Sequence, residues 1–340
     1  WSGCESGMRV GGWKANRECD SRMAFMGMTI WIRGARLKTL PLAIAPVLIG
    51  ASLAWHDAGE RRVAVAFLCS FVALLLQIAA NFANDYSDGI RGTDAGRSVP
   101  VKDTDDSAVS GKATPSRGPA RLVASGVNPK KVLVAAGICA LAACLCGLAV
   151  IALTGYWWFI LVGIACLAAC WCYVGGKHPY GYHYLGEIFV FIFFGLVATC
   201  GTMFALSGTI TPDGLLGGSA AGLVAVAVLC VNNLRDIESD GNHGKHTWMT
   251  AMGLRNGTIF TIAILIISAL IALRHLLQSS MYAVNSIPLI AIIAIIAILC
   301  AAQIAASCAI ARKNYRKALP LCTLASLIVA TVFVLSSILA

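Results

Sequence analysis

Long apolar stretches constrain this chain more than any other feature. Each is close to the ~20 residues that a helix needs to cross the hydrocarbon core of a bilayer. Nine of them cover residues 39–56, 63–83, 132–153, 156–174, 187–207, 215–233, 257–273, 284–310 and 319–340. Their Leu, Ile, Val and Ala lack the alternation of a barrel strand. Because only 12% of the 340 residues are charged, against about a quarter in soluble proteins, we predict an all-α polytopic membrane protein of about nine transmembrane helices.

Basic residues are divided very unevenly between the two sides of this arrangement. Counted along the sequence, 23 of the 26 Lys and Arg residues fall in the N-terminal arm and the loops after the second, fourth, sixth and eighth stretches. The positive-inside rule then predicts a protein of the cell membrane with a cytoplasmic N-terminus and an external C-terminus. The net charge of +10 indicates attraction to anionic lipid headgroups rather than nucleic-acid binding, because no separate basic domain exists.

The remaining organisation is simple. Residues 1–30 lack the contiguous apolar core of a secretory signal, and we expect a disordered arm there. Residues 31–340 are expected to form one membrane domain, with a flexible loop insertion over about 95–116. Most of the 14 cysteines lie inside the apolar stretches, where a thiol is a small packing residue. The long polar loops share the predicted cytoplasmic side, so an active-site cap is expected there.

Two of the apolar stretches end in clusters of acidic and amide side chains. If the second helix continues to Asp88, then Asn81, Asp85 and Asp88 fall at i, i+4 and i+7 on one face, and Asn84 is one turn from Asp88. The sixth stretch ends in the same way, with members at i, i+4 and i+8: Asn232, Asp236 and Asp240. Carboxylates at a membrane edge are often only solvated residues. Two such clusters on one side, each following an amide, instead indicate a site.

The clustered carboxylates need a counter-charge, because like charges one turn apart destabilise a helix by ~0.2–0.5 kcal/mol per pair. Oxygen ligands without Cys or paired His favour Mg²⁺, which commonly bridges carboxylates and substrate phosphates. Basic residues also stand beside both clusters: Arg235 and Lys245 near the second, and Arg91, Arg117 and Arg121 near the first. The sequence therefore predicts a magnesium site that binds a diphosphate.

Several segments resemble a known family. The stretches "NDYSDGIRGTD" (84–94) and "NNLRDIESDGNHGKHT" (232–247) resemble the two aspartate-rich motifs of the UbiA superfamily of intramembrane prenyltransferases. Three further segments resemble its 1,4-dihydroxy-2-naphthoate polyprenyltransferase subgroup: "WIRGARLKTLPLAIAPVLIG" (31–50), "RGPARLVASG" (117–126) and "YLGEIFVFIFFG" (184–195). The similarity runs from about residue 30 to the C-terminus. The chain departs from the family in a longer link between Asp94 and Gly118 and in Ala251, where an Arg is expected.

The resemblance implies an activity and a set of site residues. The activity is Mg²⁺-dependent transfer of a polyprenyl group from an allylic polyprenyl diphosphate to 1,4-dihydroxy-2-naphthoate, with loss of CO₂ and diphosphate, to give demethylmenaquinone. The expected metal ligands are Asp85, Asp88, Asp236 and Asp240, which with Lys245 are the expected catalytic residues. The expected substrate-binding residues are Arg36, Asn81, Asn84, Asp94, Arg117, Arg121, Tyr182, Asn232, Asn233 and Arg235.

Other interpretations stay open at this stage. The acceptor could equally be 4-hydroxybenzoate, homogentisate or a phospho-sugar, since all would use the same diphosphate end. A cation transporter is a different class, but its carboxylates should lie inside the spans rather than at one edge. Arg36 also fits a positive-inside anchor and Tyr182 an interfacial aromatic belt. Glu187 fits either a helix N-terminal acid or an acceptor-site residue.

Overall fold

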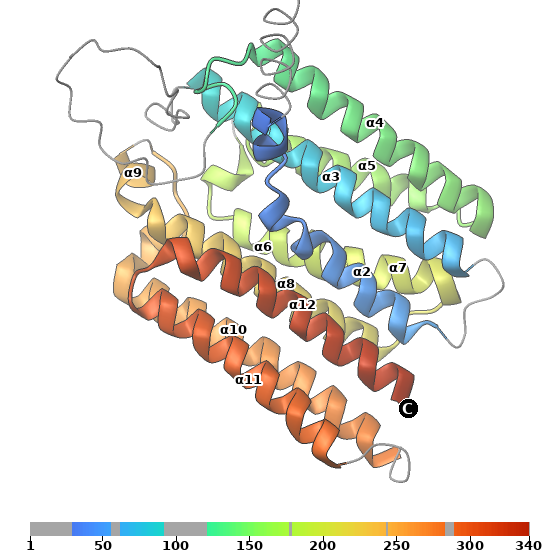
Figure 1. Cartoon of the computed structure of the whole chain (residues 1–340). Helices are drawn as coiled ribbons and strands as arrows, with labels where there is room; N and C mark the ends of the chain where they lie inside the picture. Colours follow the sequence, from blue (N-terminus) through green and yellow to red (C-terminus); the bar gives the residue numbers. More distant parts are fainter. Residues whose placement is uncertain are drawn as a thin grey trace, which may run out of the picture.

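The structure is a computed structural model that describes residues 29–55, 62–91, 121–176, 179–242, 244–282 and 289–339. Figure 1 shows long helices lying side by side. Their bounds are α2 (Pro41–Leu53), α3 (Arg62–Arg91), α4 (Pro129–Thr154), α5 (Phe159–Cys172), α6 (Gly186–Phe191), α7 (Ala198–Ser207), α8 (Pro212–Arg235), α9 (Ile237–Asn242), α10 (Trp248–Tyr282), α11 (Leu289–Ala311) and α12 (Tyr315–Leu339). A π-helical segment, η3 (Ile192–Val197), joins α6 to α7, and two 3₁₀ turns are η1 (Leu37–Thr39) and η2 (Tyr180–Tyr182). The predicted all-α class is confirmed.

Seven helices in the described ranges are long and apolar enough to cross a membrane. An eighth span results if the pair Thr29–Thr39 and Pro41–Leu53, bent by 47°, counts as one. Each of the nine predicted stretches coincides with a helix. The stretch 156–174, however, forms only the 14-residue helix α5, because Gly155 in the left-handed region (φ 77°) ends α4 and the chain then turns through Trp157 and Trp158.

Local sequence signals account for where several helices begin and end. Pro129 and Pro212 occupy the first position of α4 and α8, where the missing N–H is not needed. Asn128 caps α4 by accepting a hydrogen bond from the Lys130 amide at 2.9 Å, and the Thr211 hydroxyl accepts from the Gly214 amide at 3.2 Å. Such caps satisfy N–H groups that the first turn leaves unpaired.

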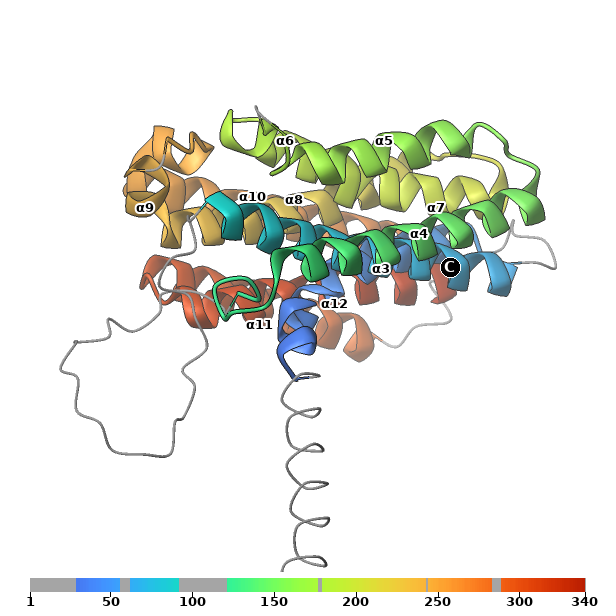
Figure 2. The same ribbon diagram turned by 90° about the horizontal axis from the view of Figure 1, so that it is seen from above.

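Helix α8 forms the centre of the bundle. Most of its length is buried, and it packs against α2, α6, η3, α10 and α12. Glycine and alanine make this close packing possible: the Cα of Gly222 and the carbonyl of Gly218 lie where a Cβ on Gly195 would stand. On the other side of the bundle α3 packs along α4 (Figure 1), and α5 lies near both. The arrangement brings the C-terminal ends of α3 and α8 to one end of the bundle, where α9 also lies (Figure 2).

Candidate active site

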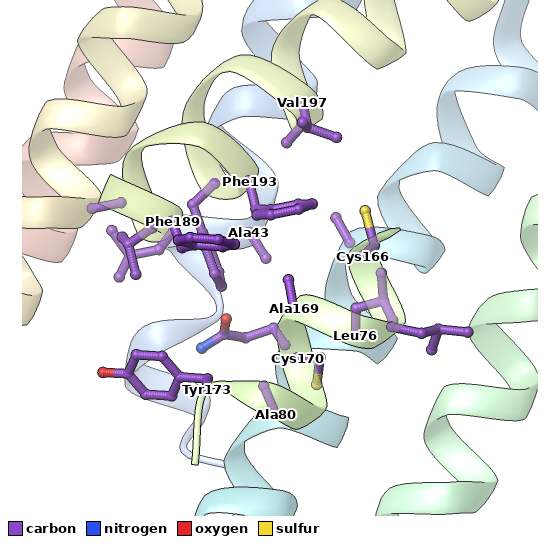
Figure 3. Close-up of a pocket in the computed structure, with 18 of the residues that line it drawn as sticks. Ala43, Leu76, Ala80, Cys166, Ala169, Cys170, Tyr173, Phe189, Phe193 and Val197 are labelled. Atoms are coloured by element: carbon purple, nitrogen blue, oxygen red, sulfur yellow. The ribbon is translucent and has the colours of Figure 1, made fainter. Parts of the chain in front are cut away.

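A cavity of about 600 Å³ lies between α2, α3, α4, α5, α6, η3, α7 and α8. Its end near α9 is polar, and the rest of its lining is apolar. Figure 3 shows part of the apolar wall, with the rings of Phe189 and Phe193 on one side and Cys166, Cys170 and Leu76 on another. A cavity with this division suits an amphiphilic ligand, with a charged head at one end and a hydrocarbon tail along the wall.

The end of α3 contributes an amide and a carboxylate one turn apart. Asn84 and Asp88 both line the cavity. The side-chain oxygen of Asn84 is buried without a hydrogen-bond partner among the described residues. One oxygen of Asp88 lies 3.4 Å from Nη2 of Arg121, and the other accepts a hydrogen bond from the Tyr182 hydroxyl at 3.4 Å. Asp88 is thus held at the edge of the cavity, and the buried Asn84 oxygen has no donor among the described residues.

The other predicted residues of this cluster have structural contacts. Asp85 is fully buried and does not line the cavity. Its Oδ1 lies 2.6 Å from the guanidinium groups of both Arg36 and Arg121, and its Oδ2 accepts from the Leu122 amide at 3.2 Å. Asn81 lines the cavity and donates to the Ala35 carbonyl at 3.0 Å. Asp85 therefore fixes two cavity-lining arginines to α3 and does not itself reach the cavity.

The end of α8 repeats the pairing seen on α3. Asn232 and Asp236, again one turn apart, line the cavity. Arg235 makes a bidentate contact to Asp236 at 2.9 and 2.7 Å. Asp240 lies off the cavity and accepts from Lys245 Nζ at 2.9 Å, and the same nitrogen lies 3.5 Å from the side-chain oxygen of Asn233. Each helix end thus presents amide side chains and one carboxylate to the same cavity.

Two loops, one containing Tyr182 and Tyr184 and the other containing His246, are hydrogen-bonded to each other beside the two clusters. The Tyr182 carbonyl accepts from the His246 amide at 3.0 Å, and the Tyr184 amide donates to the His246 carbonyl at 3.0 Å. The Arg91 guanidinium lies 5.4 Å from the centre of the Tyr182 ring. Burial and the nearby Asp88 carboxylate raise the pKa of Tyr182, so its hydroxyl is held protonated and donates to Asp88.

Glu187, which the sequence left between two interpretations, is buried in α6 and accepts a hydrogen bond from the Asn233 side chain at 3.1 Å. It supports a cavity-lining amide and does not line the cavity itself. The apolar wall residues Phe189 and Phe193 were not identified from the sequence, because nothing distinguishes them from other residues of an apolar helix. The predicted site residues Asp94 and Arg117 and the insertion over 95–116 lie outside the described residues. Of the predicted arm over 1–30, residues 1–28 also lie outside them, and residues 29 and 30 are helical.

The donor set at the polar end fits magnesium. No three His, Cys, Asp or Glu side chains in the described ranges are grouped tightly enough to hold a metal by themselves. The cavity-lining residues from both helix ends instead carry oxygens of the right kind, in the side chain of Asn84 and in the carboxylates of Asp88 and Asp236. Mg²⁺ is typically bound by one or two carboxylates together with substrate phosphates, and these residues would hold such an ion.

Residues 43–336 match the UbiA prenyltransferase family. The chain belongs to this family. The resemblance found in the aspartate-rich motifs is thereby confirmed, as is the predicted enzyme class, a prenyltransferase.

Several curated relatives of this UbiA family member carry the name 1,4-dihydroxy-2-naphthoate octaprenyltransferase. The protein of Mycobacterium tuberculosis is 42% identical over 225 residues, which cover 66% of this chain and 70% of that protein. The protein of Mycobacterium leprae is 41% identical over 226 residues, covering 66% and 69%. The protein of Escherichia coli is 36% identical over 228 residues, covering 66% and 68%.

Solved structures share the fold at low sequence identity. A UbiA homolog from Aeropyrum pernix aligns with a TM-score of 0.63 and 15% identity over 88% of this chain and 98% of that one. A UbiA homolog from Archaeoglobus fulgidus, solved bound to DMAPP and Mg²⁺, aligns with a TM-score of 0.54 and 13% identity over 91% and 97%. These likenesses show that this UbiA family member has the fold of those proteins.

Proposed function

We propose that this protein transfers a polyprenyl group from an allylic polyprenyl diphosphate to 1,4-dihydroxy-2-naphthoate, with loss of CO₂ and diphosphate, to give the quinol form of demethylmenaquinone. The observation that carries the proposal is the single cavity that receives an amide–carboxylate pair from each of α3 and α8 and continues along an apolar wall. The identity of the acceptor rests on the shared name of the curated relatives.

The polar end binds the diphosphate. Four cationic side chains line it: Arg36, Arg121, Arg235 and Lys245. Asp88 and Asp236 would hold Mg²⁺, with the Asn84 oxygen as a further ligand, and the bound ion would neutralise charge on the diphosphate oxygens. Asp85 and Asp240 contribute indirectly, by positioning the cationic side chains. Asp85 holds Arg36 and Arg121 through contacts of 2.6 Å, and Asp240 holds Lys245 through a contact of 2.9 Å. The cations then stabilise the negative charge that develops on the leaving diphosphate.

The apolar part of the cavity holds the prenyl tail and keeps water from the allylic carbon. Breaking the carbon–oxygen bond leaves a delocalised allylic cation, which water would capture. The Phe189 ring stacks on Tyr180 with centroids 4.3 Å apart and lies 6.0 Å from the Phe193 ring, which fixes aromatic faces in the wall. Such faces stabilise a cation by ~1–2 kcal/mol each when desolvated.

The second half of the reaction is an aromatic substitution, in which one bond forms and one breaks at the same ring carbon. The ring carbon that carries the carboxylate attacks the allylic carbon, and a carbon–carbon bond forms. The bond from that ring carbon to the carboxylate then breaks and releases CO₂, and its electron pair restores the aromatic ring. No oxidant or reductant is consumed.

The test uses membranes that contain the full chain, with a polyprenyl diphosphate, carboxyl-labelled 1,4-dihydroxy-2-naphthoate and Mg²⁺. We expect a prenylated quinol and labelled CO₂ in equal amounts, and no product after chelation with EDTA until Mg²⁺ is restored. Asp88→Asn and Asp236→Asn should each lower the rate by at least about 100-fold, the effect of removing a group that stabilises transition-state charge.

Asp213→Asn is the matched control. Asp213 lies in the first turn of the same helix as Asp236, and 23 residues at 1.5 Å per residue place it roughly 35 Å away along α8. This variant should keep the parent rate. Product with 4-hydroxybenzoate or homogentisate in place of the naphthoate would overturn the acceptor assignment, and full activity in both site variants would overturn the assignment of the site.

A further inference from the structure

One polar group in the cavity has no role in the reaction described so far. Gln77 lies on α3 below the diphosphate end, and side chains at 77, 81, 84 and 88 line the cavity at helical spacing. From Gln77 to Asp88 is 11 residues, or about 16 Å along the helix. Figure 3 shows apolar residues of the same two helices in the cavity wall, with Leu76 and Ala80 on α3 and Ala43 on α2.

The hydrogen bonds around Gln77 fix which way its amide faces. The Thr39 hydroxyl donates to the Arg36 carbonyl at 2.9 Å, so towards Gln77 it can only accept. The Gln77 amide nitrogen therefore donates to Thr39 Oγ1, at 3.2 Å. The Gln77 carbonyl oxygen is left without a partner among the described residues. That oxygen is buried, and Gln77 as a whole is only 8% exposed.

A buried acceptor without a donor is unfavourable, and native proteins rarely leave one unless a ligand or water completes it. A prenyl tail has no donor to offer. The diphosphate also has none, and it lies at the other end of the polar stripe. A hydroxylated aromatic ring in the cavity does have a donor. We propose that Gln77 binds the aromatic acceptor by accepting a hydrogen bond from a ring hydroxyl.

This inference rests on the proposed function and adds a residue that selects the acceptor. The diphosphate head occupies the α9 end of the stripe, and the ring lies between that head and Gln77. The hydroxyl that Gln77 accepts from is the one remote from the alkylated carbon, because the groups nearest that carbon face the diphosphate. An acceptor that lacks this hydroxyl leaves the Gln77 oxygen unpaired, so the parent protein discriminates against it.

The experiment compares the parent with Gln77→Met, which keeps the length and apolar volume of the side chain and removes the acceptor oxygen. With the full chain in membranes, the KM for 1,4-dihydroxy-2-naphthoate should rise about tenfold, and the KM for the prenyl diphosphate should stay within about twofold. Competition by 1-hydroxy-2-naphthoate, which lacks the remote hydroxyl, should be equally strong in both proteins. The variant therefore loses the parent's preference for the dihydroxy compound.

Gln303→Met is the matched control. Gln303 on α11 is also buried with unpartnered amide atoms, and it does not line the cavity. Both KM values should be unchanged in that variant. Suppose that the parent turns over the naphthoate and that Gln77→Met keeps the parent's KM for it and the parent's preference for the dihydroxy compound. The role proposed for Gln77 is then wrong, and the proposed function stands. If the parent makes no product from the naphthoate, the proposed function itself fails.

Discussion

At the scale of single residues, neighbouring carboxylates have different tasks. Asp85 is enclosed by Arg36, Arg121 and the Leu122 amide, and Asp88 faces the cavity. Arg36 has a left-handed backbone conformation (φ 52°) that disfavours a side chain by roughly 1–2 kcal/mol, and its ion pair with Asp85 helps to hold that conformation. From this geometry we expect a structural role for Asp85 and a role in the site for Asp88.

This division predicts different responses to the same substitution. Asp85→Asn leaves two guanidinium groups around a neutral amide, and removing one partner from a buried ion pair typically destabilises a fold by ~3–5 kcal/mol. Asp88→Asn should have a smaller effect, because the Asp88 side chain is 16% exposed and lies 3.4 Å from Arg121. Thermal unfolding of the detergent-solubilised variants measures the difference. Equal melting temperatures would contradict the structural role of Asp85.

The raised pKa of Tyr182 leads to a prediction about how the reaction rate depends on pH. Burial and Asp88 raise the pKa of its hydroxyl above the ordinary value of about 10, so the neutral donor is present at every lower pH and is lost only above it. Tyr182→Phe should reduce kcat/KM by no more than about fivefold, because the bond to Asp88 is long at 3.4 Å. The rate profile from about pH 6 to about pH 9 should keep the parent's shape. Disappearance of one limb of the profile in the variant would show that Tyr182 titrates there.

At the scale of helices, the site depends on how closely α8 approaches α6 and η3. A Cβ on Gly222 would lie 2.8 Å from the Phe191 ring and 2.9 Å from the Phe191 carbonyl oxygen. The backbone cannot yield as a flexible side chain can, so the helices would have to separate. The same contact positions Phe189 and Phe193 in the wall and supports the α8 end that carries Asp236.

Gly222→Ala should therefore destabilise the protein by ~1–3 kcal/mol, the usual effect of overpacking, and lower the rate as well. Gly137→Ala on α4 is the control, since a Cβ there meets nothing within 4 Å. Because alanine favours a helix over glycine by ~1 kcal/mol, the control should be as stable as the parent or slightly more so. Melting temperature and prenyl transfer, measured together, test the pair. A Gly222→Ala protein as stable as the control would show that α8 can move without loss.

At the scale of the whole molecule, the polar ends of α3 and α8 lie together and the C-terminus lies at the opposite end of the bundle from α9 (Figures 1 and 2). The basic residues of the loop between α11 and α12, such as Arg312 and Lys313, precede the helix that runs to that opposite end. The positive-inside rule then predicts that the site faces the cytoplasm and the C-terminus faces outside.

A reporter that is active only outside the cytoplasm tests this orientation. Alkaline phosphatase fused after the last residue, Ala340, should be active. The same enzyme fused after Ala311, at the end of α11, should be inactive. The reverse pattern would show that the site faces outward. Activity in both fusions would show that α12 does not cross the membrane.

The sequence by itself determined the class of protein, the position of most helices and the kinds of side chain in the site. Apolar length and clusters of charge are local properties that burial in lipid requires, so they can be read without the fold. Helical spacing also predicted that Asn84 and Asp88, and Asn232 and Asp236, lie one turn apart.

Tertiary structure alone decided which of these groups face the cavity. Spacing cannot distinguish the Asp85 side of α3 from the Asp88 side, because that depends on where Arg36, Arg121 and Leu122 pack. Gln77 has the same helical spacing but stands inside an apolar stretch, and only its bond to Thr39 shows that an oxygen is left over. Side-chain partners from distant segments are set by packing, and packing is a property of the whole bundle.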